Sequence, residues 1–338
     1  MPKNSLIALL VSTSLMTAVG FSFLASKAMP QEGKSSLLAQ LQKSPVNVRE
    51  IKEFAGAITS LAVSPDGQTL LVASGDGKIA AIALNELKEI YTKTFPATPN
   101  SLAISSDGQS MAAAAGEEIA VFRVKDGTQK ATLRGHVSKI STLAFSPDNK
   151  MLVSVSGGDR TIRIWNLESE DLLKTLGENV GPETTVAFSP DGRFFVTGSI
   201  GEDRTIKLWD ARSLQLLKTS SQQPGYIYDV AITPDGQKIV AAVRNLVKVW
   251  QFDSGEELFS MRGARLDLNA IAISPDGRTV ATANKEGTIT LWDLATGQLL
   301  TTLKGHRGWV LALAFSPDGK YLYSGAEDKI VKIWQIAR

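Results

Sequence analysis

The sequence predicts an all-β fold, a seven-bladed β-propeller in which each blade is a sheet of four antiparallel strands. Two observations lead to this prediction. A turn of the type Ser-Pro-Asp-Gly recurs about every 40 residues, which is a repeat length typical of propeller blades. Around each turn lie short segments with apolar residues at every second position, as expected for strands. The turn aspartates are Asp66, Asp107, Asp148, Asp191, Asp235, Asp276 and Asp318.

The last repeat, residues 305–335, shows the repeating unit most completely. Three strands are expected in it, with the sequences VLALAF, KYLYSG and KIVKIWQ. Pro317 fixes φ in the first turn and Gly319 can adopt positive φ there. A unit of three strands cannot bury both of its faces alone, so repetition is required. An aromatic residue closes the third strand in all copies except the first, which has Ile82: Phe122, Trp165, Trp209, Trp250, Trp292 and Trp334.

These copies resemble the tryptophan–aspartate (WD) repeat family, and the resemblance covers about residues 48–338. Trp-Asp pairs occur at Trp209-Asp210 and at Trp292-Asp293, and Gly-His pairs at Gly135-His136 and at Gly305-His306. The resemblance rests on seven copies in phase rather than on the dipeptide. It implies a closed propeller that binds its partner on one face. The style of the repeats also resembles exported bacterial proteins.

The charge balance argues against nucleic-acid binding. The chain has 36 basic and 34 acidic residues, and the two lysines of residues 1–28 account for the difference. A protein that binds through phosphate contacts needs net or clustered positive charge, which is not evident here. The chain has no cysteine, so disulfides, thiolate zinc sites and cysteine nucleophiles are excluded.

Residues 1–28 are expected to be a signal peptide or a signal anchor. Lys3 provides a short basic start, residues 6–25 are mostly apolar, and Ser26 to Ala28 offer small residues for cleavage before Met29. The apolar run is also long enough to span a bilayer, so an uncleaved membrane anchor at residues 6–25 is the alternative. Both interpretations place the propeller outside the cytoplasm, either periplasmic or extracellular.

Residues 29–47 are polar and contain Pro30, Gly33 and Pro45, as expected of a linker. Residues 48–54, VREIKEF, match the position of an outer strand that precedes a Gly-His pair, whereas the last repeat ends without an outer strand of its own. We therefore expect this first strand to complete the last blade and close the ring. Closure removes a sheet edge that would otherwise be open.

The WD resemblance gives the only two histidines a structural role. In that family the Gly-His histidine begins a buried network that continues through aspartate and serine to tryptophan. Two blades carry the full set: His306, Ser324, Asp328 and Trp334 in blade seven, and His136, Ser154, Asp159 and Trp165 in blade three. A shared metal site is disfavoured, because the two histidines lie four repeats apart. The other blades depart from the pattern and are expected to rely on apolar packing.

No catalytic motif accompanies the repeats. The Pro-Asp-Gly aspartates are expected to be turn residues, too far apart around the ring to form one acidic site. The sequence has no Gly-x-Ser-x-Gly, phosphate loop or His-Glu-x-x-His. A non-enzymatic protein without a cofactor or a metal is therefore expected.

The candidate binding site lies on the face where each outer strand crosses to the next inner strand. Aligning these connections places apolar and aromatic residues in blades five and seven, with polar residues of blade six between them. Exposed tyrosine and tryptophan with a polar rim is typical of a binding hot spot. The alternative is that these aromatic residues only cover the core. The candidate residues are Tyr226, Tyr228, Arg265, Asp267, Asn269, Trp309 and Leu311.

The sequence thus favours an exported, non-catalytic scaffold that binds a protein or peptide on the face of blades five to seven. A small-ligand or glycan binder is an alternative, since the same aromatic residues could stack on a sugar. A propeller hydrolase or lyase is less favoured, because no convergent set of acids and bases is visible. The propeller is expected to be monomeric, to bind no nucleic acid, and to touch a membrane only through an uncleaved N-terminal segment. These functional expectations depend partly on analogy with the fold.

Overall fold

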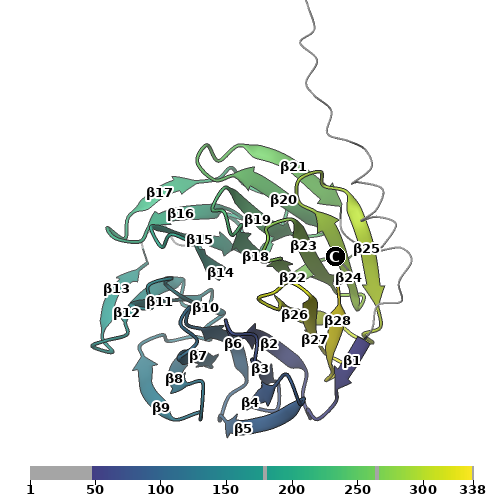
Figure 1. The fold of residues 1–338 in the computed structure, drawn as a ribbon. Coiled ribbons are helices and arrows are strands. Elements are labelled where there is room, and N and C mark those ends of the chain that lie inside the picture. Colours follow the sequence, from purple (N-terminus) through teal and green to yellow (C-terminus); the bar gives the residue numbers. More distant parts are fainter. Residues whose placement is uncertain (1–47, 178–180, 263–265, 337–338) are drawn as a thin grey trace, which may run out of the picture.

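A computed structural model describes residues 48–177, 181–262 and 266–336. Within these ranges the chain forms strands and turns and no helix. The strands make seven four-stranded antiparallel sheets that are arranged as a ring (Figure 1). The predicted seven-bladed β-propeller is therefore confirmed. The predicted signal segment and linker, residues 1–28 and 29–47, lie outside the described residues.

Blades one to six each contain four consecutive strands, ordered from the centre of the ring to its rim (Figure 1). Blade one contains β2 (Ile58–Val63), β3 (Thr69–Ser74), β4 (Lys78–Ala83) and β5 (Lys88–Thr94). Blade two contains β6 (Pro99–Ile104), β7 (Ser110–Ala115), β8 (Glu118–Arg123) and β9 (Gln129–Arg134). Blade three contains β10 (Thr142–Phe145), β11 (Met151–Ser156), β12 (Thr161–Asn166) and β13 (Leu172–Leu176).

The second half of the ring follows the same order. Blade four contains β14 (Glu183–Phe188), β15 (Phe194–Ser199), β16 (Ile206–Asp210) and β17 (Leu216–Thr219). Blade five contains β18 (Ile227–Ile232), β19 (Lys238–Val243), β20 (Leu246–Gln251) and β21 (Glu257–Arg262). Blade six contains β22 (Leu268–Ile273), β23 (Thr279–Asn284), β24 (Thr288–Asp293) and β25 (Leu299–Lys304).

Blade seven joins the two ends of the described chain. Its inner strands are β26 (Val310–Phe315), β27 (Tyr321–Ala326) and β28 (Val331–Gln335), and its outer strand is β1 (Val48–Ile51). The register of β1 on β28 pairs Val48 with Trp334 and Ile51 with Val331. The ring is therefore closed by the first strand, as the sequence indicated, although this strand ends at Ile51 rather than at residue 54.

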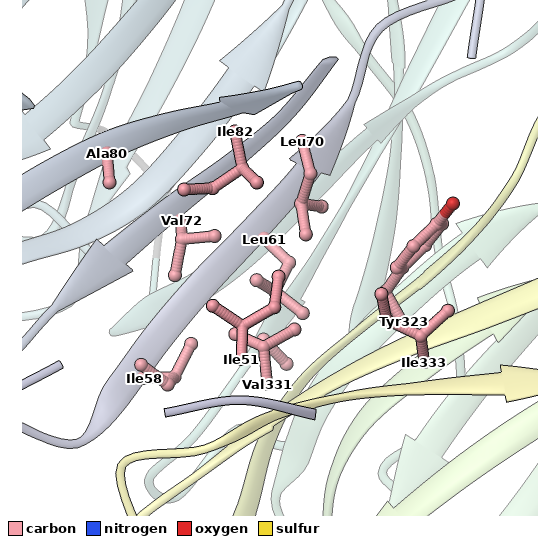
Figure 2. Close-up of a cluster of buried hydrophobic side chains, with 11 residues drawn as sticks. Ile51, Ile58, Leu61, Leu70, Val72, Ala80, Ile82, Tyr323, Val331 and Ile333 are labelled. Carbon is pink, nitrogen blue, oxygen red and sulfur yellow. The ribbon is translucent and has the colours of Figure 1, made fainter. Parts of the chain in front are cut away.

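The core consists of clusters packed between neighbouring blades. The cluster between blades seven and one contains Ile51 of β1, Ile58 and Leu61 of β2, and Val331 and Ile333 of β28 (Figure 2). Ile51 is only 5% exposed, so the closing strand contributes to this core as well as to the sheet. Strand residues alternate between two such clusters because their side chains point to opposite faces of a sheet.

Side chains of the inner strands also bond one blade to the next. The hydroxyl of Ser60 accepts a hydrogen bond from the backbone N–H of Leu102 at 3.0 Å, and that of Ser101 accepts one from Leu143 at 3.1 Å. At the matching place in blade five, Asp229 Oδ2 accepts from the N–H of Ile271 at 2.9 Å. These bonds satisfy buried backbone donors at the blade boundaries.

The Pro-Asp-Gly aspartates lie in turns. In blade seven Ser316 donates to Asp318 Oδ1 at 2.6 Å, and the same oxygen accepts the N–H of Lys320 at 3.0 Å. Gly319 follows with a φ of 68°, a conformation that glycine adopts without strain. The same Ser-to-Asp bond occurs in the first turn, between Ser64 and Asp66.

Candidate functional site

Three predicted site residues owe their position to β-bulges at the start of the inner strands. Tyr228, Asn269 and Leu311 are each skipped in the pairing with the next strand, which passes from Ile227 to Asp229, from Leu268 to Ala270 and from Val310 to Ala312. A bulge leaves its extra residue unpaired and re-aims the side chain. These residues therefore sit where the chain arrives from the preceding blade.

Lys285, in the loop between β23 and β24, connects the aromatic residues of blades five and seven. Its ammonium group lies 5.3 Å from the centre of the Tyr228 ring and 4.8 Å from the centre of the Trp309 ring. A cation within about 6 Å of an aromatic centre is attracted by the negative face of the ring. One lysine of blade six thus links both neighbouring blades.

Asp267 of blade six places a carboxylate beside Tyr228 and Lys285. Its Oδ2 accepts the O–H of Tyr228 at 3.0 Å and lies 3.5 Å from Nζ of Lys285. Burial, followed by the hydrogen bond to Asp267, raises the pKa of Tyr228 to about 12. The phenol therefore remains a hydrogen-bond donor at neutral pH.

Two aromatic rings of this arrangement are exposed. Tyr226 is 48% exposed and Trp309 is 43% exposed, and the rings of Tyr226 and Tyr228 meet edge to face at 6.3 Å. Exposed tyrosine and tryptophan beside charged groups is a composition typical of a binding hot spot. We call Tyr226, Tyr228, Asp267, Lys285 and Trp309 the aromatic ledge.

Not every predicted site residue belongs to this ledge. The Asn269 side chain donates to the carbonyl of Val310 at 3.2 Å, so its amide joins blades six and seven. Leu311 is half-buried in β26. Arg265 lies outside the described residues. Tyr226, Tyr228, Asp267 and Trp309 are the four that the structure brings together.

Lys285 is not among the predicted residues, because it does not lie in a connection from an outer strand to the next inner strand. The loop between the second and third strands of a blade ends on the same face, because antiparallel strands reverse direction at each turn. Aligning those loops as well would have placed Lys285 of blade six and Arg244 of blade five on this face. Arg244 Nε lies 3.9 Å from Asp267 Oδ1.

The two histidines lie in buried hydrogen-bond chains. In blade seven Trp334 Nε1 donates to Ser324 Oγ at 2.8 Å, and this hydroxyl lies 2.7 Å from His306 Nε2. The other ring nitrogen, Nδ1, lies 2.9 Å from Asp328 Oδ2. The Asp328 carboxylate only accepts hydrogen bonds, so the proton lies on Nδ1, and Nε2 accepts the O–H of Ser324. Burial holds the pKa of His306 below its ordinary value.

Blade three repeats the chain with the four residues expected there. Trp165 Nε1 donates to Ser154 Oγ at 2.9 Å, and Ser154 Oγ lies 2.7 Å from His136 Nε2. His136 Nδ1 lies 2.8 Å from Asp159 Oδ2. Within the ranges that the structure describes, no group of three or more His, Asp or Glu residues could hold a metal ion.

Blade four corrects the expectation that blades without histidine rely on apolar packing. Lys207 Nζ lies 2.8 Å from Glu183 Oε1 and 2.8 Å from Asp203 Oδ2. The side chains of Lys207 and Glu183 are only 5% and 0% exposed. The WD pattern concerns histidine, aspartate, serine and tryptophan positions, so it does not predict a buried ion cluster that contains Lys207 and Glu183.

Comparison with known proteins supports the repeat assignment. A family model described as "WD domain, G-beta repeat" matches residues 47–80, 127–166, 171–210, 255–293 and 297–335.

Among the residues that the structure describes, no helix is long and apolar enough to cross a membrane.

Three relatives are similar to parts of the chain. A WD repeat-containing protein of Synechocystis sp. is 55% identical over 254 residues, 75% of this chain and 73% of that protein. Periodic tryptophan protein 2 of Arabidopsis thaliana is 31% identical over 147 residues, 42% of this chain and 16% of that protein. Notchless protein homolog of Arabidopsis thaliana is 40% identical over 60 residues, 18% of this chain and 12% of that protein. The closed ring, the matched repeats and the extent of the first similarity together show that the chain belongs to the WD40 repeat family.

Proposed function

We propose that this protein is a non-catalytic scaffold that binds a segment of another protein on the aromatic ledge. WD40 propellers are typically protein-interaction scaffolds and generally non-catalytic. The observation that carries the specific proposal is the position of Lys285 between Tyr228 and Trp309, by which blade six joins aromatic residues of blades five and seven into one surface. Aromatic residues with polar neighbours supply most of the binding energy at many protein interfaces.

The ledge suits a peptide better than a sugar. One face of the Trp309 ring carries the Lys285 ammonium, and the rings of Tyr226 and Tyr228 are packed against each other edge to face. A sugar needs a broad free ring to stack on, whereas a peptide can combine apolar contacts with hydrogen bonds and charges. Asp267 and Lys285 provide such polar groups directly between the rings.

The test compares retention of proteins from the envelope fraction by wild type and by a double variant, Tyr226→Ala with Trp309→Ala. We expect a retained protein to be lost with the double variant while the melting temperature stays unchanged, because both rings are exposed. Leu299→Ala is the matched control, since Leu299 is 51% exposed but lies on the rim strand β25. If the double variant melts well below wild type, the rings serve the core and the proposal fails.

We also propose that the propeller works outside the cytoplasm. The proposal is supported by the sequence of residues 1–28, with its basic start, apolar run and small residues before Met29. Mass determination of the mature N-terminus in fractionated cells tests it. A chain that begins at Met29 indicates a cleaved signal peptide, an intact chain in the membrane fraction indicates the anchor, and an intact chain in the cytoplasm contradicts export.

A further inference from the structure

A pocket of about 340 Å³ adjoins the aromatic ledge where blades four, five and six meet. It is lined by Arg204, Pro224, Gly225, Tyr226, Tyr228, Arg244 and Asp267. Two arginines and one aspartate give the lining an excess of positive charge. Tyr226 and Tyr228 belong to both the pocket and the ledge, so a segment lying on the ledge passes its opening.

Arg204, which lines this pocket, has an unused hydrogen-bond donor. Its Nε is buried and has no hydrogen-bond partner within the part of the chain that the structure describes. The backbone around it is fixed, because the Arg204 carbonyl accepts the N–H of Gln223 at 2.9 Å. A buried donor without an acceptor is uncommon in proteins and calls for an explanation at that position.

Arg244 is the second arginine of the pocket lining. Its side chain is 68% exposed, and its Nε is 3.9 Å from Asp267 Oδ1, which is too long for a hydrogen bond. Asp267 is already engaged by Tyr228 and Lys285. Arg244 is therefore attracted to Asp267 but not saturated by it.

Basic residues are distributed unevenly among the surrounding loops. The loops between the second and third strands carry a basic residue in blades three to seven and none in blades one and two. The basic residues are Arg160, Arg204, Arg244, Lys285 and Lys329. The same loops also carry six acidic residues, Asp159, Glu202, Asp203, Glu286, Glu327 and Asp328, so the preference for an anion belongs to the pocket of Arg204 and Arg244 and not to the whole face.

We propose that the pocket binds the carboxylate of a glutamate or aspartate side chain of the bound protein segment. The planar guanidinium group matches a carboxylate with paired hydrogen bonds, so Arg204 and Arg244 can hold one between them. The inference rests on the proposed function, since the acidic residue belongs to the segment that lies on the ledge. It adds the sequence preference of the bound segment, which would place an acidic residue in the pocket and a neighbouring apolar or aromatic residue against Trp309.

The probe is a random 12-residue peptide library displayed on phage and selected on the purified propeller. We expect the selected peptides to share an acidic residue near an apolar or aromatic one. Changing that acid to its amide in a synthetic peptide should weaken binding about tenfold or more, which is the loss expected for a charge-assisted contact. Arg244→Gln should weaken binding of the acidic peptide by a similar factor and leave binding of the amide peptide nearly unchanged.

Arg160→Gln is the matched control, because Arg160 has the corresponding loop position in blade three, outside the pocket. Arg204→Gln is a second variant, to be used with a thermal melt because Arg204 is partly buried. Equal affinity for the acidic and amide peptides, or equal loss with Arg160→Gln and Arg244→Gln, would overturn the inference.

The two proposals fail in different ways. Selected peptides could bind wild type, lose binding with Tyr226→Ala and Trp309→Ala, and contain no acidic residue. That result would support peptide binding on the aromatic ledge and contradict the carboxylate pocket. If the selected peptides bind independently of Tyr226 and Trp309, the ledge itself is wrong. Enrichment of acidic peptides that require both Trp309 and Arg244 supports both.

Discussion

Glu50 of β1 accepts a hydrogen bond from Nζ of Lys332 in β28, a residue 282 positions further along the chain. The side chain of Lys332 is 7% exposed and that of Glu50 is 28% exposed, so the pair is largely shielded from solvent. The bond adds a charged contact to the backbone pairing of the two strands. Together they hold the first strand in the last blade.

Glu50→Gln should lower the free energy of unfolding by about 1–2 kcal/mol, because it leaves the Lys332 ammonium without its anion. Urea unfolding and the melting temperature measure this. The double variant with Lys332→Met should recover part of the loss, since it leaves no unpaired ammonium at the buried position. If Glu50→Gln unfolds like wild type, the ion pair does not contribute to closure.

The same pair has a pH signature. The hydrogen bond from Lys332, with a second one from Lys52, lowers the pKa of Glu50 from 4.5 to about 2. A carboxyl with a lowered folded pKa contributes stability above its unfolded pKa and loses it in acid. The gap between wild type and Glu50→Gln should therefore be complete above pH 4.5 and close as the pH falls toward 2.

Asp328→Ala should destabilise blade seven by about 1–3 kcal/mol, because His306 Nδ1–H loses its acceptor in a buried site. The N–H of Arg307 also loses a bond of 2.9 Å to Asp328 Oδ2. A thermal melt followed by tryptophan fluorescence measures the change. Asp318→Ala is the comparison, since the hydrogen bonds of Asp318 to Ser316 and Lys320 lie within its own turn. A melt indistinguishable from wild type would count against a stabilising role for the histidine chain.

The buried carboxyl group of Asp229 should make the propeller less stable at neutral pH than in mild acid. Burial raises the pKa of Asp229 from 3.8 to about 6, although it accepts bonds from Ile271, Thr185 and Val230. A raised carboxyl pKa contributes stability below the unfolded pKa, and this contribution is lost as the pH rises through the folded value. The loss amounts to about 3 kcal/mol across this window.

Asp229→Ser tests this, because serine occupies the corresponding place in blades one and two and accepts the same inter-blade bond there. Unfolding is measured at about pH 4 and about pH 7, where we expect wild type to lose more stability than the variant by up to about 3 kcal/mol. The two histidines titrate in both proteins and cancel in the comparison. Parallel pH profiles would show that Asp229 is not strained by burial.

Lys285→Met should weaken binding of the retained partner about tenfold, because it removes the cation between Tyr228 and Trp309. The melting temperature should change little, because the site is partly exposed. Equilibrium binding of the partner retained by wild type measures this. Lys329→Met is the matched control, since Lys329 lies in the corresponding loop of blade seven and is exposed. Equal affinities for wild type and Lys285→Met would exclude the lysine from the binding surface.

The sequence by itself determined the number of blades, their order and the strand that closes the ring. These features depend on local patterns that recur in phase: Pro-Asp-Gly turns such as that of Asp318, alternating apolar residues, and the tryptophan that ends the third strand. It also placed Tyr226, Asp267 and Trp309 on neighbouring blades of one face, because sequence-adjacent repeats are neighbours in the ring.

Only the tertiary structure decided which side chains meet. Lys285 reaches Tyr228 and Trp309 across two blade boundaries, and Lys207 joins Glu183 within blade four. These contacts join residues of different strands or loops, so they depend on bulges and loop geometry rather than on spacing in the sequence. The repeat pattern treats Asn269 and Asp267 alike as face residues, yet the bulge turns the Asn269 amide to the backbone of the next blade while Asp267 meets Lys285. That difference follows from side-chain direction, which a periodic sequence does not specify.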